Sequence, residues 1–388
     1  MSIPMKNLHF LIAFAAIIAL TITACQKDNS EELAPPDADL SLEDQALSTG
    51  VQFMPEAEYN RLPVANPLEI PSLMPTDATS DRAAYRLLAT PPVGNQGGEG
   101  SCTAWATAYC VSSYYMRIFN KDWAYTNAQA VRSPEFLYNA TKVNSSCASG
   151  AYMNTVLNYM KSTGVCAWSQ MPYTDSGCST LPNASQKSQA AVGKLASWQT
   201  VAKTVTAVKD LINLGYPLLV AFDVNTNFKT QTFNVPYTYK SFNNAGYTGG
   251  HVVTIVGYDD DKQRLILQNS WGTGRHDNGF FYVSYSFFPS MAKELYVAVP
   301  VFPTFTVRHA SAVGDVTFNV NGKDYLIKKG QTLSVPGFLN TNAYFMWECL
   351  WQNNAWACKW DGDYKPVYGK KYKIIDMSQN WDMKLVAE

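Results

Sequence analysis

Residues 96–106 read Gln-Gly-Gly-Glu-Gly-Ser-Cys-Thr-Ala-Trp-Ala, a glycine-rich turn that leads into a cysteine. Ser101 is a candidate N-cap, and the pattern predicts a helix from about Ser101 through Phe119. A cysteine in the first turn of a helix faces unpaired backbone N–H groups and the positive end of the helix dipole, which favour its thiolate. Cys102 is therefore a candidate nucleophile. Taken by itself, the segment also fits a buried structural or disulfide-bonded cysteine.

Two further short stretches carry chemistry. Residues 249–258 read Gly-Gly-His-Val-Val-Thr-Ile-Val-Gly-Tyr, so His251 opens an apolar strand after a Gly-Gly turn. Residues 268–274 read Gln-Asn-Ser-Trp-Gly-Thr-Gly. Asn269 can accept the ring N–H of His251 and fix its tautomer, and Trp271 can keep water away from that bond. Each stretch alone also fits a structural histidine or a turn with a packing tryptophan.

The three stretches together are far more specific than any one of them. His251 follows Cys102 by 149 residues and Asn269 follows it by 167, near the order and spacing of papain-like enzymes. Gln96 stands six residues before the cysteine, and the Asn-Ser-Trp-Gly block follows the histidine strand. On these motifs residues 86–299 resemble the papain family of cysteine peptidases. The match spans about 215 of the 388 residues.

The resemblance implies a role for each residue of the set. Cys102 would be the nucleophile, and His251 its general base and later the acid that protonates the leaving amine. Asn269 would orient the imidazole, and the Gln96 amide with the Cys102 N–H would form the oxyanion hole. It also implies protein or peptide substrates and no metal or cofactor. The substrate-binding residues expected from it are Gly150, Gly250 and Trp271.

The sequence departs from the usual family pattern at several positions. Thr103 stands where a Trp normally follows the nucleophile, and Glu99 replaces a Cys, so the usual disulfide of the first lobe cannot form. Cys147-Ala-Ser-Gly150 replaces Cys-Asn-Gly-Gly and leaves Gly150 as the only glycine for backbone pairing with substrate. Gly-Arg-His276 replaces Gly-Trp, and His276 is expected in a surface loop.

The periodicity predicts helices first and strands second, an α+β fold with two lobes. The papain-like expectation is a helical lobe with Cys102 and a β-barrel-like lobe with His251 and Asn269. In residues 301–388 apolar and polar residues alternate as in strands, and Asn321-Gly322 is a hairpin turn signal. This pattern predicts a small all-β domain. Beyond the first helix, the expected helices are 135–140, 152–163 and 207–214, and the expected strands are 217–224, 251–258, 264–268 and 279–285.

The N-terminus has the pattern of a bacterial lipoprotein signal. Lys6 precedes an apolar run that is short for a membrane span and ends Ile-Thr-Ala-Cys25. This resembles a lipobox, in which Cys25 becomes the lipidated first residue; the alternative is an ordinary signal peptide with a coincidental cysteine. We expect a signal peptide over 1–24, a lipid-anchored tether or short prosegment over 25–85, and a peptidase domain over 86–300. The expected location is outside the cytoplasm, attached to a bacterial envelope membrane.

The composition and the cysteine count limit the partners, disulfides and metal sites that can be expected. Charged residues make up 16% of the chain, against about 25% in typical soluble domains, and the net charge is -1. No basic patch indicates nucleic acid binding, and a monomer is expected. Apart from Cys25 and Cys102 there remain six cysteines, which allow 15 complete pairings. We expect one disulfide between Cys349 and Cys358 and another between Cys166 and Cys178, with Cys110 as a free thiol in the core. The cysteines and histidines lack the spacing of a zinc site, so no metal is expected.

The leading hypothesis is an extracytoplasmic, lipid-anchored endopeptidase that acts through a thioester at Cys102. The alternatives are a cell-wall peptide hydrolase of the Cys-His type and a non-catalytic surface binding protein. The sequence has no long charged helical prosegment before residue 86. If residues 26–85 nevertheless inhibit the enzyme, cutting them off would also separate the enzyme from its lipid.

Overall fold

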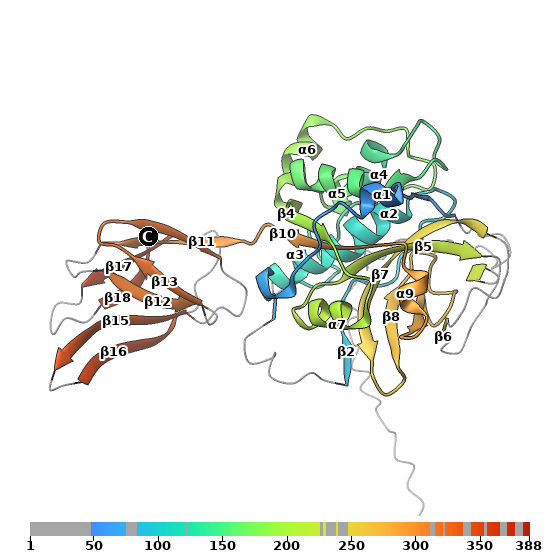
Figure 1. Ribbon diagram of the computed structural model, residues 1–388. Coiled ribbons are helices and arrows are strands. Elements are labelled where there is room, and N and C mark those ends of the chain that lie inside the picture. The colour runs from blue at the N-terminus through green and yellow to red at the C-terminus, as the bar shows by residue number, and fades with distance from the viewer. Residues whose placement is uncertain are drawn as a thin grey trace, which may run out of the picture. The chain divides into compact units, whose positions relative to one another are not determined.

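The computed structural model describes most of the chain after residue 47 (Figure 1). The described residues are 48–74, 84–120, 123–225, 228–229, 238–239, 247–310, 315–320, 323–336, 343–352, 355–364, 371–376 and 383–388. The expected signal peptide, Cys25 and most of the tether lie outside them. No helix within this described part has both the length and the apolar character needed to cross a membrane.

A continuous helical run carries the candidate nucleophile. It begins at Cys102 and ends at Phe119, as the sequence predicts, but its middle two turns are a π-helix, Trp105–Ser112. π-helical turns are rare in proteins overall, and those that occur are frequently at functional sites. The α-helices of this lobe are α2 (Cys102–Ala104), α3 (Ser113–Phe119), α4 (Pro134–Thr141), α5 (Met153–Ser162) and α6 (Ala184–Ala190).

Local capping signals set the other helix ends. The Ser133 hydroxyl accepts the Phe136 N–H at 3.1 Å, and Pro134 occupies the first helical position of α4. Helix α5 ends just before Gly164, and α7 (Val205–Asn213) ends just before Gly215. Both glycines have positive φ values, 94° and 90°, which end a helix without strain. The three helices predicted after the first one are thus confirmed, each within about two residues.

The second lobe is built on an eight-stranded sheet. Its strand order is β4-β10-β5-β7-β8-β9-β6, and β2 pairs with β7. The strand that carries His251, β7 (Tyr247–Asp259), lies between β5 and β8 and contacts α2 and the π-helix. The other strands are β2 (Tyr85–Leu87), β4 (Leu195–Thr200), β5 (Leu218–Asn225), β6 (Thr238–Tyr239), β8 (Arg264–Gln268), β9 (Phe280–Ser284) and β10 (Glu294–Pro300).

The sheet contains the four strands that the sequence predicts, with β8 matched at both ends. Strands β2, β4, β6 and β10 were not predicted. β2 and β6 are very short, β10 is buried throughout, and β4 does not alternate between buried and exposed residues. Gly257 in β7 has a packing reason: a Cβ there would lie 2.2 Å from the Arg86 carbonyl oxygen of β2. Two further short helices are α1 (Glu56–Tyr59) and α9 (Phe288–Met291).

The described residues between 304 and 387 contain strands and turns but no helix. They make two four-stranded sheets, ordered β14-β11-β17-β18 and β13-β12-β15-β16. In the described part, a small core contains Phe305, Val307 and Ile374. Val320 pairs with Lys323, which fits a two-residue hairpin connection, although Asn321-Gly322 lie outside the described residues. The strands are β11 (Thr304–His309), β12 (Val316–Val320), β13 (Lys323–Ile327), β14 (Thr332–Pro336), β15 (Ala343–Gln352), β16 (Ala355–Tyr364), β17 (Lys371–Asp376) and β18 (Met383–Ala387).

Candidate active site

Cys102 is the first residue of α2 and is completely buried. Burial raises the pKa of its thiol to about 11, because a thiolate there would lose its hydration. Backbone N–H groups of Val252 and Gly50, among others, lower the pKa by less. In this structure the sulfur is therefore a neutral thiol, although the helix start alone favours a thiolate.

His251 on β7 meets Asn269, which directly follows the neighbouring strand β8. The Nε2 atom of His251 lies 2.8 Å from Oδ1 of Asn269, and the Trp271 ring stacks on the imidazole with 4.4 Å between centroids. The Asn269 oxygen also accepts the Ser270 N–H at 2.8 Å, which holds the amide in place. An oxygen acceptor places the ring proton on Nε2, so Nδ1 is left as the basic nitrogen. That nitrogen is buried and has no hydrogen-bond partner in the described part of the chain.

Burial also controls the protonation of His251. It lowers the pKa of the imidazole to about 3, and the Asn269 bond offsets only part of the shift. The imidazole is consequently neutral at ordinary pH, opposite a neutral Cys102 thiol. Both shifts have the same cause, the exclusion of water from the site.

The side-chain amide of Gln96 is held by three hydrogen bonds. Its Nε2 atom donates to the backbone carbonyl of Glu99 at 3.0 Å and to that of Ser48 at 3.2 Å. Its Oε1 atom accepts the Ser270 hydroxyl at 2.6 Å. These partners fix which end of the amide is the donor, so the N–H bonded to Ser48 is the one available to an oxyanion.

The site is closed by the chain itself, through residues 48–54, here called the occluding segment. The Trp271 indole donates to the Ser48 carbonyl at 3.1 Å, and the Gly50 N–H donates to the Gly250 carbonyl at 3.0 Å. The Ala151 N–H donates to the Gly50 carbonyl at 2.9 Å, where β1 (Val51–Gln52) pairs in parallel with β3 (Ala151–Tyr152). The segment thus bridges both lobes across Cys102.

All three expected substrate-binding residues touch this segment. Gly250 and Trp271 bond to it directly, and a Cβ on Gly150 would lie 1.7 Å from the Gly50 carbonyl oxygen. The backbone of Gly150 is used elsewhere, because its N–H donates to the Tyr138 hydroxyl at 3.3 Å. The neighbouring Ala151 N–H makes the pairing that the sequence assigns to Gly150.

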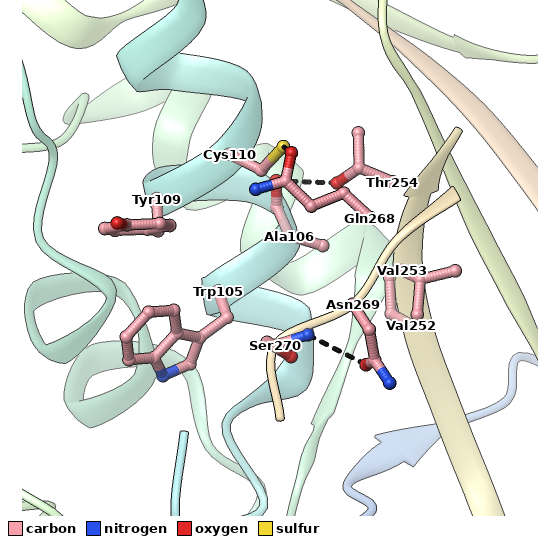
Figure 2. A pocket seen from close by; sticks show the side chains of 10 residues that line it. All are labelled: Trp105, Ala106, Tyr109, Cys110, Val252, Val253, Thr254, Gln268, Asn269 and Ser270. Atoms are coloured by element: carbon pink, nitrogen blue, oxygen red, sulfur yellow. Dashed lines mark hydrogen bonds between the residues drawn. The ribbon is translucent and has the colours of Figure 1, made fainter. Parts of the chain in front are cut away.

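A small cavity of about 10 Å³ lies between the π-helix and strands β7 and β8 (Figure 2). It is lined by Cys110, whose thiol donates to Gln268 Oε1 at 3.5 Å. The Thr254 hydroxyl donates to the Ala106 carbonyl at 3.4 Å, as Figure 2 shows. Cys110 is a free, buried thiol, which confirms the prediction for it.

Two sequence predictions near the site are wrong. His276 is buried, with 4% of its surface exposed, and packs among Trp271, Phe228 and Phe281. Its backbone has a positive φ of 53°, a left-handed conformation that is uncommon for residues other than glycine. Burial lowers the pKa of this second imidazole to about 4.

The second wrong prediction is a disulfide. Cys178 bonds to Cys147, and Cys166 is a free, buried thiol. The sulfurs of Cys147 and Cys178 lie near the Glu99 carboxylate, but as disulfide sulfurs they are not thiolate ligands for a metal. Cys349 pairs with Cys358 in the backbone register of β15 and β16, and the bond between them stays a prediction.

Several residues of the site were not found from the sequence. Ser270 positions the Gln96 amide, and the Tyr173 hydroxyl donates to the Gln96 carbonyl at 2.7 Å. Ser270 lies within the Asn-Ser-Trp-Gly block, which was the signal available for it. The occluding segment has no such signal, because its role depends on contacts between residues far apart in the chain.

The fold and these side chains define a class: an α+β protein in which a helix that starts with a buried cysteine contacts the strand of a His–Asn pair. The comparison with protein families gives the narrower assignment. The chain belongs to the papain family of cysteine proteases, whose model matches residues 78–297.

Individual relatives agree with this assignment. The chain is 26% identical over 210 residues to an uncharacterised peptidase C1-like protein of Acanthamoeba polyphaga mimivirus, covering 50% of this chain and 64% of that protein. It is 29% identical over 203 residues to cathepsin B-like CP2 of Giardia intestinalis, covering 49% and 63%. The chain thus spans less than two thirds of the length of these relatives. The solved structure of xylellain, a cysteine protease from Xylella fastidiosa, shares the papain-like fold with a TM-score of 0.52 and 23% identity, covering 68% of this chain and 100% of that one.

Proposed function

We propose that this protein is a thiol endopeptidase that hydrolyses peptide bonds in proteins or peptides through Cys102. The observation that carries the proposal is the bond between His251 Nε2 and Asn269 Oδ1, which leaves Nδ1 as a base on the strand that contacts the nucleophile helix. The oriented Gln96 amide supplies the anion-binding donor the reaction needs.

The chemistry follows from these atoms. His251 Nδ1 takes the Cys102 thiol proton, and the thiolate attacks the substrate carbonyl carbon. The carbonyl oxygen becomes an oxyanion that accepts hydrogen bonds from Gln96 Nε2 and the Cys102 N–H. The amine leaves with the proton from His251, and a thioester remains on Cys102. A water molecule, deprotonated by His251, then hydrolyses the thioester and restores the thiol.

The occluding segment supports an endopeptidase rather than an exopeptidase. Residues 55–74 follow Met54 and pack on the peptidase lobes, as the 2.8 Å bond from the Ala65 N–H to the Thr200 carbonyl illustrates, so the polypeptide in the groove continues beyond it at this end. A groove that lets the polypeptide continue past Met54 can accept a substrate that extends beyond the scissile bond. The same contacts keep substrate out, so the intact chain is an inactive precursor.

We further infer that the protein is exported and anchored through lipid on Cys25. The lipobox pattern is the support for this part. Both the anchor and the occluding segment lie on the N-terminal side of the peptidase lobes, so one cut after Met54 activates the enzyme and frees it from the membrane. Mass spectrometry of the active form tests this coupling, and an active chain that still begins at Cys25 contradicts it.

Labelling with a thiol-reactive epoxide tests the proposed activity. The reduced chain with its groove opened by Gly50→Ala should become labelled on Cys102 and should hydrolyse a fluorogenic peptide. Cys110 and Cys166 are buried internal controls that should stay unlabelled, and the Cys102→Ala chain should show neither reaction. A folded, reduced and opened chain without labelling or hydrolysis would overturn the proposed function.

A further inference from the structure

Glu99 stands where the papain family's usual pattern has a cysteine, and it links three parts of the site. Its backbone carbonyl accepts the Gln96 Nε2 hydrogen at 3.0 Å, and its backbone N–H donates to Asp175 Oδ1 at 3.1 Å. Its side-chain Oε1 accepts the Cys178 N–H at 3.1 Å. The oxyanion-hole amide is therefore tied through one residue to the segment that carries the Cys147–Cys178 disulfide.

The Glu99 carboxylate is almost completely buried, with 1% of its surface exposed. Its second oxygen, Oε2, has no hydrogen-bond partner within the described residues. A carboxylate with one oxygen unsatisfied inside a protein is unfavourable, so the neutral acid is favoured. No catalytic step described above uses this group.

The surroundings of Glu99 add negative charge. Glu135 on α4 and Asp175 both repel the ionised form; Asp175 also accepts the Gly98 N–H at 2.6 Å. The Tyr138 and Tyr173 hydroxyls also face it. The cation of this region, Lys142, donates to the Cys178 carbonyl at 2.6 Å.

Burial is the largest cause of the raised pKa of Glu99, followed by Glu135, and together they bring it to about 7. The Cys178 N–H and the Tyr173 hydroxyl lower it by less. Because the folded pKa lies above the ordinary value of 4.5, the group stabilises the turn fully below that value and loses this contribution as the pH rises through 7.

We propose that Glu99 is a positioning residue whose protonation state sets the orientation of the Gln96 amide and thereby the quality of the oxyanion hole. The neutral acid holds residues 96–101 against the Tyr173–Cys178 segment. The carboxylate is pushed away from Glu135 and Asp175, and it moves the Glu99 carbonyl that anchors Gln96 Nε2. The catalytic consequence rests on the proposed function, whereas the coupling between Glu99 and Gln96 does not.

A spectroscopic titration of the intact chain tests that coupling without any need for activity. The Gln96 side-chain amide resonances, assigned by their loss in Gln96→Glu, should shift between pH 5.5 and 8.5 with a midpoint near 7. In Glu99→Gln the shift should vanish. In Glu135→Gln the midpoint should move to lower pH, because the repulsion that raises the Glu99 pKa is removed. The exposed Glu69→Gln is the matched control and should leave the midpoint unchanged.

Kinetics of the chain opened by Gly50→Ala give the second readout. We expect kcat to fall about tenfold as Glu99 ionises, with KM little changed. This is less than the roughly 10²–10³-fold loss of kcat that follows complete removal of an oxyanion donor, because the amide is displaced and not deleted. Glu99→Gln should abolish this decline, and Glu135→Gln should shift it to lower pH. Gln96 resonances that titrate alike in the wild-type and Glu99→Gln chains would overturn the proposal. An opened chain with coupled resonances but no hydrolysis would instead count against the proposed function alone.

Discussion

The backbone carbonyl oxygen of Ser48 accepts a hydrogen bond of 3.2 Å from the side-chain amide of Gln96. The donor that we propose for the oxyanion of a substrate is thus occupied by the protein's own backbone. The Trp271 indole holds the same carbonyl from the other lobe at 3.1 Å. Because both donors are saturated and Cys102 is fully buried, substrate can enter only when residues 48–54 leave.

Gly50 is the residue at which the occluding segment is most sensitive to substitution. A Cβ at this position would lie 1.9 Å from the Gly100 carbonyl oxygen, which is backbone and cannot rotate away. We expect Gly50→Ala to expel the segment and to raise the rate of epoxide labelling at Cys102 roughly tenfold or more, since overpacking typically costs about 1–3 kcal/mol. Ala196→Ser, which adds one side-chain atom at an exposed position, is the control. Equal labelling rates in the two variants would contradict occlusion by fit at Gly50.

Ser270 should matter for rate more than for substrate binding. Its hydroxyl donates to Gln96 Oε1 at 2.6 Å, so Ser270→Ala leaves a buried oxygen unsatisfied and frees the amide to rotate. In the opened enzyme we expect kcat to fall about tenfold with little change in KM, because the lost orientation acts mainly on the oxyanion. Ser286→Ala, at an exposed position, serves as the comparison. A rise in KM with constant kcat would show that Ser270 contributes to binding instead.

The predictable features of this protein are those set by near neighbours in sequence. Ser133 and Pro134 fix the start of α4, and the predicted strand 264–268 has the same first and last residues as β8. The contact between His251 and Asn269 was expected because the motif places both at the ends of neighbouring strands. These signals were enough for the α+β class and for the residues that face one another across the site.

The features that could not be predicted depend on fit between distant residues. Gly50 closes the groove because it passes the backbones of Gly100 and Gly150, which no local pattern reports. His276 is buried because Phe228, which is far earlier in the chain, packs against it together with Trp271. The predicted disulfide partner of Cys178 was wrong for the same reason. Nearness in sequence favoured Cys166, but Cys147 lies beside Cys178 in space.

The Cys147–Cys178 disulfide should contribute measurably to stability. It joins residues 31 positions apart, and loop-closure entropy for that length corresponds to about 3–4 kcal/mol. We expect the double variant Cys147→Ser with Cys178→Ser to lose about this much free energy of unfolding in urea. Cys166→Ser, which removes a free thiol, is the control.

Peptide mapping checks the same disulfide independently. Alkylation of the unfolded but unreduced chain should modify Cys102, Cys110 and Cys166 among the cysteines of the peptidase lobes. A peptide in which Cys166 is linked to Cys178 would contradict the pairing reported above.

Acid should weaken the occluded state. The pKa of His251 is lowered from 6.5 to about 3 by burial beneath the segment, so the neutral imidazole stabilises closure above about pH 6.5 and this contribution is lost as the pH falls toward 3. The pKa of Cys102 is raised from 9 to about 11, so its contribution is complete below pH 9 and is lost as the pH rises through 11. Closure is therefore strongest between about pH 6.5 and 9. We expect hydrogen exchange at the Gly50 amide, which is bonded to the Gly250 carbonyl, to accelerate below pH 6 beyond its intrinsic pH dependence.

In His251→Gln, which cannot gain a proton in this range, that extra acceleration should be absent. The same acceleration in both chains would assign acid opening to another group.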